Sequence, residues 1–275
     1  MMSAGGDAAF RALLQQLGEA QDLRVDAYKD SCLRRRVAVR MRACGVHTYN
    51  DYARRIREDG DECDRFLAAL TINVTKFYRN ADMWDFVLGS VLPELLEARG
   101  NAIRCWSAGC ASGEEAYTLA VLLLEGAGRT RMDPLHGPCI DATDLDPRSL
   151  QTAADARYPE EAFGEMPRTL VARYFPPEGR EHDVRAVAGE VRELVRFQRH
   201  DLTREPPIDP PYDLILFRNV VIYFQRVMQE RIFATMAHAL NPGGTLVLGK
   251  VETLFGSACD LLRKRNVRER VYRRP

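Results

Sequence analysis

Two glutamates at the start of a predicted helix indicate a binding site for a positively charged ligand. Glu114 and Glu115 follow the glycine-containing stretch 107–113, which itself follows an apolar run that ends at Trp106. This order predicts a strand, a tight turn and a helix whose free backbone N–H groups face a ligand. A phosphate would be repelled by the two carboxylates. S-adenosylmethionine, with its ammonium and sulfonium groups, matches this charge pattern better than NAD does.

An acidic residue at the end of the next predicted strand adds a second binding group. The predicted strand at 138–143 leads to Asp144, and Asp146 then precedes Pro147. In nucleotide-binding α/β folds an acidic residue of this kind hydrogen-bonds a ribose hydroxyl, and this is the role that we expect for Asp144. Asp146 is expected to cap the helix that begins at Pro147. Helix capping is also the alternative for Asp144.

Two further segments carry polar groups that the same ligand can use. The stretch 71–80 places polar donors around the aromatic pair Phe77 and Tyr78, a mixture that a simple linker does not need. Farther along, Asp201 closes a predicted strand, and we expect it to accept a hydrogen bond from an adenine amino group.

A buried strand at 213–217 is predicted to bring Arg218 and Asn219 to the carboxyl end of the sheet, where α/β proteins bind ligands. Tyr223 follows in the same motif. Taken alone, Arg218 is equally suited to a surface ion pair, and Tyr223 to a core position with an exposed hydroxyl. Because all these segments are expected at one sheet edge, we favour a shared binding site.

The elements that would position these residues alternate along the second part of the chain. The pattern predicts strands at 103–106, 138–143, 213–217 and 245–249, and helices at 113–125, 147–156 and 226–239. This order is typical of a doubly wound, Rossmann-like α/β sheet. Short alternating pieces predict an insertion at about 157–200 that contains a helix and a small antiparallel β-subdomain, with a hairpin at 182–197. The end of the chain, 269–272, is expected to pair with the strand at 245–249.

The first part of the chain has helical periodicity and no convincing strand. Helices are predicted at 8–17, 25–43, 49–58 and 62–70, and a further helix at 82–98. We therefore expect a small all-α domain at 1–70, a linker with a connecting helix at 71–98, and a catalytic domain at 99–275.

Composition limits the classes of protein. The 275 residues suffice for a full α/β domain and a smaller module, and Lys+Arg and Asp+Glu balance at 39 each, so no net charge favours nucleic acid. No apolar run is long enough to span a membrane, and the start of the chain lacks the features of a signal peptide. The seven cysteines form no CxxC pair, and the histidines have no HExxH spacing. We expect a cytoplasmic monomer without metal, without direct membrane insertion and without a nucleic-acid partner.

Four motifs in order resemble the chemoreceptor glutamate methyltransferases of the CheR family. They are NxTxFYR at 73–79, the turn at 108–117, ATDLD at 142–146 and RNVxIYF at 218–224. The resemblance runs from about Tyr28 to the C-terminus. It implies transfer of a methyl group from S-adenosyl-L-methionine to glutamate carboxylates of the cytoplasmic helices of a chemoreceptor, with S-adenosyl-L-homocysteine as the product.

The resemblance also implies roles for single residues. Asn73, Thr75 and Arg79 would wrap the cofactor from the linker. Of the two glutamates, Glu115 more than Glu114 would hold its ammonium group.

On the strand ends, Asp144 would bind the ribose of the cofactor. Asp201 and Leu202 would bind the adenine, and Arg218 and Asn219 would contact the other flank of the cofactor.

The same resemblance implies that Arg79 and Tyr223 orient the substrate glutamate. A glutamate carboxylate is ionised at neutral pH, with an ordinary pKa of about 4.3, so no general base is required. Catalysis is expected to come from holding the two reactants in a near-attack geometry.

Three positions depart from the usual family pattern. Asp201 replaces a frequent asparagine and Ala116 a common proline. The sequence Gly-Lys-Val-Glu at 249–252 replaces Gly-His-Ser-Glu, and the contribution of this strand end is left open.

A predicted basic helix at 28–43 offers a surface for an acidic partner. We expect receptor binding by four of its arginines, Arg35, Arg36, Arg40 and Arg42. A solvated basic face without a partner is the alternative.

Two other functions compete with this interpretation. The string Asp-Pro-Pro-Tyr at 209–212 resembles the active-site loop of adenine-N6 methyltransferases, but there it follows an apolar strand and here it precedes one. A catalytically silent, cofactor-binding signalling scaffold is the other alternative, and the presence of Arg79 and Tyr223 disfavours it.

Overall fold

The computed structural model describes residues 4–71, 75–127, 139–178 and 183–275. The chain divides into two compact units, one formed by Met1–Ile72 with Tyr223–Gln229 and the other by Asn73–Ile222 with Glu230–Pro275. Within the described ranges, no helix is both long and apolar enough to cross a membrane.

The first unit is helical, as predicted. Its elements are α1 (Ala4–Gln21), the 3-10 turn η1 (Val25–Ala27), α2 (Asp30–Ala43), α3 (Tyr49–Glu58) and α4 (Glu62–Thr71). Helix α1 packs on α3 and α4, and α2 packs on α4. The apolar stripes of these helices bury Phe10, Leu33, Val37, Tyr52 and Phe66.

The helix predicted at 25–43 is interrupted near its start. Tyr28 is extended and forms a β-bridge with Phe224, and their rings lie 4.9 Å apart. Lys29 N donates a hydrogen bond to Tyr223 O at 2.9 Å. These pairings take the backbone groups that a continuous helix would need, so α2 begins only at Asp30.

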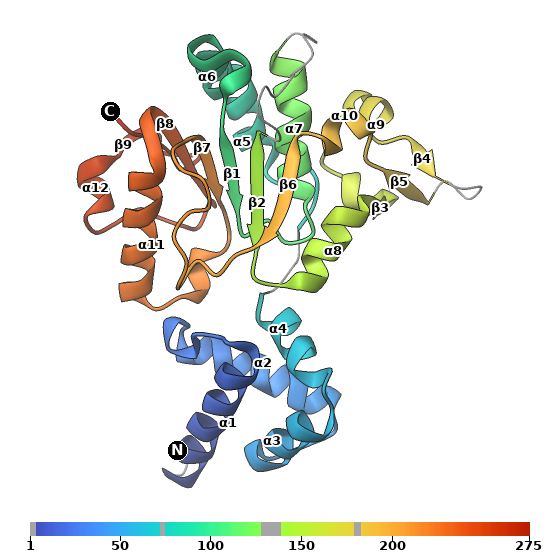
Figure 1. Cartoon of the computed structure of the whole chain (residues 1–275), viewed down its shortest axis with the longest axis vertical. Helices are drawn as coiled ribbons and strands as arrows, with labels where there is room; N and C mark the ends of the chain where they lie inside the picture. Colours follow the sequence, from blue (N-terminus) through green and yellow to red (C-terminus); the bar gives the residue numbers. More distant parts are fainter. Residues whose placement is uncertain (1–3, 72–74, 128–138, 179–182) are drawn as a thin grey trace. The chain divides into compact units, whose positions relative to one another are not determined.

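The second unit contains a seven-stranded sheet in the order β6-β2-β1-β7-β8-β10-β9. Its strands are β1 (Cys105–Ala108), β2 (Ile140–Asp144), β6 (Val195–Arg199), β7 (Tyr212–Phe217), β8 (Leu240–Leu248), β9 (Arg263–Asn266) and β10 (Val271–Arg273). The first five strands in this order are parallel, so their carboxyl ends meet at one edge, as the arrows of β1 and β2 show in Figure 1. Every residue of β1, β2 and β7 is buried, which a parallel sheet covered on both faces requires. The Rossmann-like fold class is confirmed.

Helices that precede the first strand or connect later strands cover the sheet (Figure 1). They are α5 (Ala81–Phe86), the π-helical turn η2 (Val87–Val91), α6 (Leu92–Arg99), α7 (Glu114–Gly126), α8 (Pro147–Asp155) and α11 (Arg226–Ala239), with short turns η3 (Gly100–Ala102), η5 (Val221–Tyr223) and α12 (Ala258–Leu261). The helix expected at 82–98 as part of a linker instead belongs to the core of this unit. Trp84, Val87 and Val91 are its buried contacts.

The small antiparallel sheet is present, but its composition differs from the prediction. It has the order β3-β5-β4 and consists of β3 (Arg157–Pro159), β4 (Pro177–Glu178) and β5 (Val184–Ala186), accompanied by η4 (Glu160–Phe163), α9 (Arg168–Tyr174) and α10 (Gly189–Arg192). The predicted hairpin at 182–197 is wrong, because β6 pairs in parallel with β2 in the main sheet. Short alternating pieces have the same pattern in either sheet, so only the tertiary packing separates them.

At the C-terminal end, β10 pairs antiparallel with β8, with Val271 opposite Val247. This confirms the predicted pairing of the end of the chain with the strand at 245–249. Strand β9, which was not predicted, extends the sheet by one further strand beyond β10.

Candidate active site

The loops at the carboxyl ends of β1 and β7 and the segment before α5 contain several unusual backbone conformations. Positive φ angles occur at Tyr78 (59°), Asn80 (68°), Ala111 (48°) and Asn219 (62°). Non-glycine residues rarely adopt such angles, and they concentrate at functional sites. Gly109 also has a positive φ, and a Cβ atom there would lie 2.4 Å from a methyl of Val220, so only glycine fits.

Asp144 stands at the end of β2, as predicted, and braces the turn after β1. Its carboxylate accepts hydrogen bonds from Ala111 N at 2.8 Å and from Asp146 N at 3.0 Å. Burial raises the pKa of Asp144. The ribose role of Asp144 stays a prediction. Asp146 caps α8 by accepting from Arg148 N at 3.0 Å, which confirms its predicted role.

The two glutamates open α7, as predicted, and each has a local partner. Glu115 accepts from Ser107 Oγ at 2.8 Å and forms an ion pair with Arg218 at 3.0 Å. Glu114 is buried and accepts from Ser112 Oγ at 2.7 Å. Burial raises the pKa of Glu114. Arg218 therefore partly neutralises the carboxylate of Glu115, and a cationic group of a ligand would be a second partner for it.

Arg218 joins the end of β7 to the segment before α5. One of its terminal nitrogens donates to Arg79 O at 2.9 Å and to Asn80 Oδ1 at 2.8 Å, while the other contacts Glu115. The guanidinium also lies 5.6 Å from the ring centre of Trp84. The side chain is 3% exposed, so the alternative of a surface ion pair is wrong.

The aromatic pair of the 71–80 stretch anchors it in the second unit. The ring of Phe77 stacks on that of Phe163 at 4.4 Å, and Tyr78 N donates to Thr118 Oγ1 at 3.1 Å. Tyr78 Oη donates to Asp85 at 2.7 Å. This anchoring leaves Thr75 and Arg79 half-buried, and Asn73 lies outside the described residues.

Asp201 has an unsatisfied buried acceptor. Its Oδ1 accepts from the N–H and the hydroxyl of Thr203 at 2.8 and 2.7 Å. Its Oδ2 is buried and has no hydrogen-bond partner among the described residues, with Arg204 Nε 3.8 Å away. An unmade buried hydrogen bond is costly, and the amino group of an adenine would supply the missing donor. The neighbouring Leu202 is half-buried.

Glu252 is a further residue of this edge to which the sequence analysis assigned no role. It is buried, and one of its oxygens accepts from Gly249 N at 2.7 Å and from Asn219 N at 2.9 Å. Burial raises the pKa of Glu252. The glutamate retained in the Gly-x-x-Glu pattern was the available signal. Tyr223 is grouped with the first unit, so its catalytic role stays a prediction.

Within α2, the four arginines expected to bind a receptor are not equivalent. Arg40 donates two hydrogen bonds, of 2.9 and 2.7 Å, to Glu62, which is buried and also accepts from Tyr52 Oη at 2.7 Å. The carboxylate raises the pKa of Arg40, and its guanidinium serves this internal cluster instead of forming part of a free basic face. Arg35 and Arg42 are exposed, whereas Arg36 is half-buried.

The Asp-Pro-Pro-Tyr string lies at the opposite, amino edge of the sheet. Tyr212 is the first residue of β7 and donates its hydroxyl to Asp141 at 3.0 Å, and Asp209 forms an ion pair with Arg104 at 2.7 Å. The string starts a strand, as predicted, and does not follow one.

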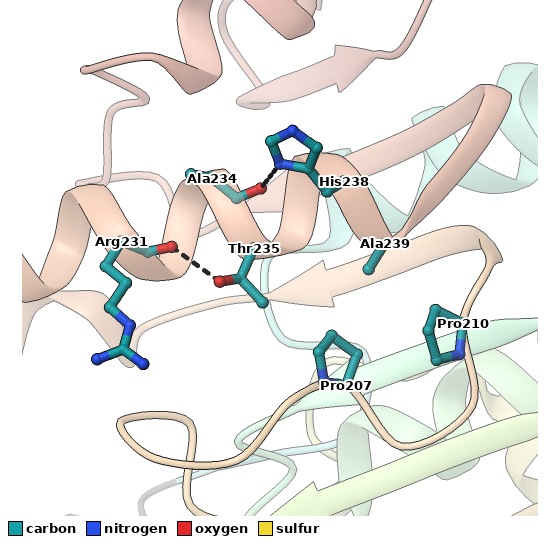
Figure 2. Close-up of a pocket in the computed structure, with 7 residues that line it drawn as sticks. All are labelled: Pro207, Pro210, Arg231, Ala234, Thr235, His238 and Ala239. Carbon is teal, nitrogen blue, oxygen red and sulfur yellow. Dashed lines mark hydrogen bonds between the residues drawn. The ribbon is translucent and has the colours of Figure 1, made fainter.

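A pocket of about 470 Å³ lies near this amino edge (Figure 2). It is lined by Pro207, Pro210, Arg231, Ala234, Thr235, His238 and Ala239. Two of its polar side chains bond to the carbonyls of their own helix, Thr235 to Arg231 O at 3.0 Å and His238 to Ala234 O at 2.7 Å, as Figure 2 shows. The pocket therefore lacks the convergent polar groups of the carboxyl edge.

Comparisons with known proteins agree with this division of the chain. Residues 8–71 match the CheR methyltransferase, all-alpha domain, and residues 73–271 match the CheR methyltransferase, SAM binding domain. A chemotaxis protein methyltransferase from Listeria innocua is 32% identical over 240 residues, which cover 86% of this chain and 88% of the relative.

Two further relatives carry related names. A chemotaxis protein methyltransferase from Klebsiella aerogenes is 31% identical over 251 residues, covering 90% of this chain and 83% of the relative. Chemotaxis protein methyltransferase 2 from Pseudomonas aeruginosa is 32% identical over 243 residues, covering 86% and 82%. S-adenosylmethionine is the cofactor of the second unit, and the chain belongs to the CheR methyltransferase family.

Proposed function

We propose that this protein transfers the methyl group of S-adenosylmethionine to glutamate side chains of the cytoplasmic helices of a chemoreceptor, forming glutamyl methyl esters. The observation that carries the proposal is the set of contacts made by Arg218. This residue binds Glu115 at the start of α7 and also binds Arg79 and Asn80, which lie in the segment before α5. Three separate parts of the sequence thus meet at the ligand-binding edge of the sheet.

The residues of this edge suit the cofactor group by group. The unsatisfied acceptor of Asp201 suits the adenine amino group, and Asp144 suits the ribose hydroxyls. Glu115 suits the ammonium group, because it is partly exposed and carries the charge opposite to it. Thr75 and Asn219 would complete the lining.

The bound cofactor supplies an electrophilic methyl group on a sulfonium. The protein contributes orientation, since a glutamate carboxylate is already ionised and needs no base. Arg79 would hold that carboxylate by charge-assisted hydrogen bonds, and Tyr223 would donate to its other oxygen. Placement of the two reactants, rather than a covalent enzyme intermediate, would then account for the rate.

A receptor helix bundle rich in glutamate is the expected partner. Arg35 and Arg42 on α2 are exposed and offer the positive charge that such a surface attracts. Arg40 is left out of this proposal because its ion pair with Glu62 is internal.

The test is transfer of tritiated methyl groups to purified cytoplasmic domains of candidate receptors. Label that is released by mild base marks a glutamyl ester, and a variant receptor with alanine at the labelled glutamates is the control. Adenine-containing oligonucleotides and mock reactions without receptor run in parallel. Label in the oligonucleotides and not in a receptor would refute the proposal in favour of a nucleic-acid methyltransferase. Cofactor binding without any transfer would favour a silent scaffold.

A further inference from the structure

Two loops at the carboxyl end of β8 are joined into one surface of the second unit. One loop carries Lys250 and Val251 after β8, and the other is the turn between β9 and β10. Arg270 Nε donates to Lys250 O at 3.3 Å. Lys250 and Arg268 both face the carboxylate of Asp82, at 3.8 and 3.1 Å. These contacts fix the two loops beside the start of α5.

Two valines of this surface are turned into solvent. Val251 is 73% exposed and Val267 is 63% exposed, whereas the valines of β8 and β10 are buried. An isolated exposed valine needs no explanation, but here two stand on loops that are joined by a hydrogen bond and by ion pairs to a shared aspartate, beside three cationic side chains. The surface therefore combines apolar contact area with positive charge.

This surface borders the candidate active site. The carboxylate of Glu252 binds Gly249 N and Asn219 N, so the loop that carries Lys250 and Val251 is attached to the strand end that carries Arg218. Asp82, on the other side, follows Arg79 by only three residues. A substrate whose carboxylate reaches Arg79 would therefore contact these two loops.

We propose that these loops, defined by Lys250, Val251, Val267, Arg268 and Arg270, form the docking surface for the helix that carries the target glutamate. This inference rests on the proposed function and names the chemistry of its substrate. The complementary helix has an aliphatic side chain that covers the two valines and carboxylates that face the cations. Lys250 supplies one of the positive charges of this surface and Val251 one of its exposed apolar side chains, so the two neighbouring residues together favour such a helix.

The test is the double variant Val251→Ser/Val267→Ser, assayed by steady-state methylation over a range of receptor-fragment concentrations. Covering about half of the two valine side chains corresponds to an expected rise in the KM for the receptor of about tenfold. The kcat at saturating receptor is expected to be unchanged, because the reacting groups are intact. Val227→Ser, at the most exposed valine of the described chain (80%), is the matched control and should leave KM unchanged.

Binding of S-adenosylhomocysteine, measured by calorimetry, should be the same in both variants and in the wild type, which excludes misfolding. An unchanged KM in the double variant, with the wild type active, overturns the docking surface and leaves the proposed function standing. A fall in kcat without a rise in KM also overturns it. A wild-type protein that labels no receptor overturns the proposed function, and this inference with it.

Discussion

The two ends of the parallel sheet both bury carboxylates, but they stabilise them by different means. At the amino edge, Asp213 accepts hydrogen bonds from Arg99 Nε, Arg104 N and Asn241 Nδ2 at 2.7 to 3.0 Å. At the carboxyl edge, Asp144 is held by backbone N–H groups, and burial raises its pKa. The first arrangement neutralises the charge within the protein. The second leaves acceptor capacity on the carboxylate that the hydroxyl groups of a ligand can use.

The same contrast separates the remaining polar groups. Asp141, at the amino edge, accepts hydrogen bonds from the side chains of Arg104 and Arg196 and from the hydroxyl of Tyr212. At the carboxyl edge, one oxygen of Asp201 has no hydrogen-bond partner among the described residues. Satisfied networks rigidify a fold, whereas an unsatisfied buried acceptor at a ligand-binding edge can accept a hydrogen bond from a ligand. The comparison therefore assigns stability to one edge and binding to the other.

Removal of the amino-edge acid should have the largest effect, and on stability alone. Asp213→Ala leaves three donors, Arg99 Nε, Arg104 N and Asn241 Nδ2, without their acceptor. We expect the free energy of unfolding to fall by about 3 kcal/mol. Urea titration measures this, and calorimetry of the folded variant should show unchanged S-adenosylhomocysteine binding. Asp209→Ala removes an exposed ion pair of the same edge and should change neither the free energy of unfolding nor the binding of S-adenosylhomocysteine. Cofactor binding lost in Asp213→Ala would contradict the comparison.

At the carboxyl edge, removal of a charged side chain should lower the rate of methyl transfer and leave stability unchanged. Arg79→Ala should lower kcat by about 100-fold or more, because the substrate carboxylate loses its orienting cation. Radiolabel transfer at saturating cofactor measures the rate, and the melting temperature should be that of the wild type. Turnover close to that of the wild type would refute the role of Arg79, whatever happens to binding.

The affinity for S-adenosylhomocysteine should depend on Asp144 at the end of β2. Asp144→Ala should weaken binding of S-adenosylhomocysteine by about 1.5–3 kcal/mol, the range for a hydrogen bond to a charged group. Calorimetry gives the dissociation constant directly. If binding were unaffected, the carboxylate of Asp144 would serve only the turn at Ala111, and the ribose assignment would be withdrawn.

Exposed charges of the first unit should affect the encounter with the receptor, and the expected effect is smaller than those above. Arg35→Glu/Arg42→Glu reverses two exposed charges and should slow receptor methylation by roughly tenfold at low salt. The effect should fade at physiological ionic strength, where screening acts over about 8 Å. Arg54→Glu, on α3, is the control. An equal effect at all salt concentrations would point to damage to the fold and not to encounter with the receptor.

The smallest expected effect is a pH dependence of stability at the carboxyl edge. Burial raises the pKa of Glu114, so the native state holds this proton over a range in which the unfolded chain has lost it. The free energy of unfolding should therefore fall as pH rises from about 4.3 to the raised value, and then level off. Glu114→Gln removes this dependence. A difference between wild type and variant that stays constant with pH, in urea titrations, would contradict the assignment.

Much of the fold follows from local pattern. The spacing of apolar residues located α3 at its observed bounds and α11 as well, because an amphipathic helix carries its own period. Likewise, Asp146 before Pro147 identified the start of α8. The motifs at the strand ends were found because parallel strands must end at one edge.

Tertiary structure decided the rest, because it depends on pairings between residues far apart in the sequence. Strand β6 joined the main sheet and not the small one, and local pattern could not show this because its partner β2 lies 55 residues earlier. Arg40 and Arg35 look alike on a basic helix, but only Arg40 meets the buried Glu62. Arg218 joins Glu115 to Arg79 and Asn80, which lie 103, 139 and 138 residues before it, and no local pattern predicts these contacts. The sequence by itself thus determined which residues reach the sheet edge. Their partners there were decided by the three-dimensional packing, because a charge is neutralised by whatever lies within a few ångströms of it.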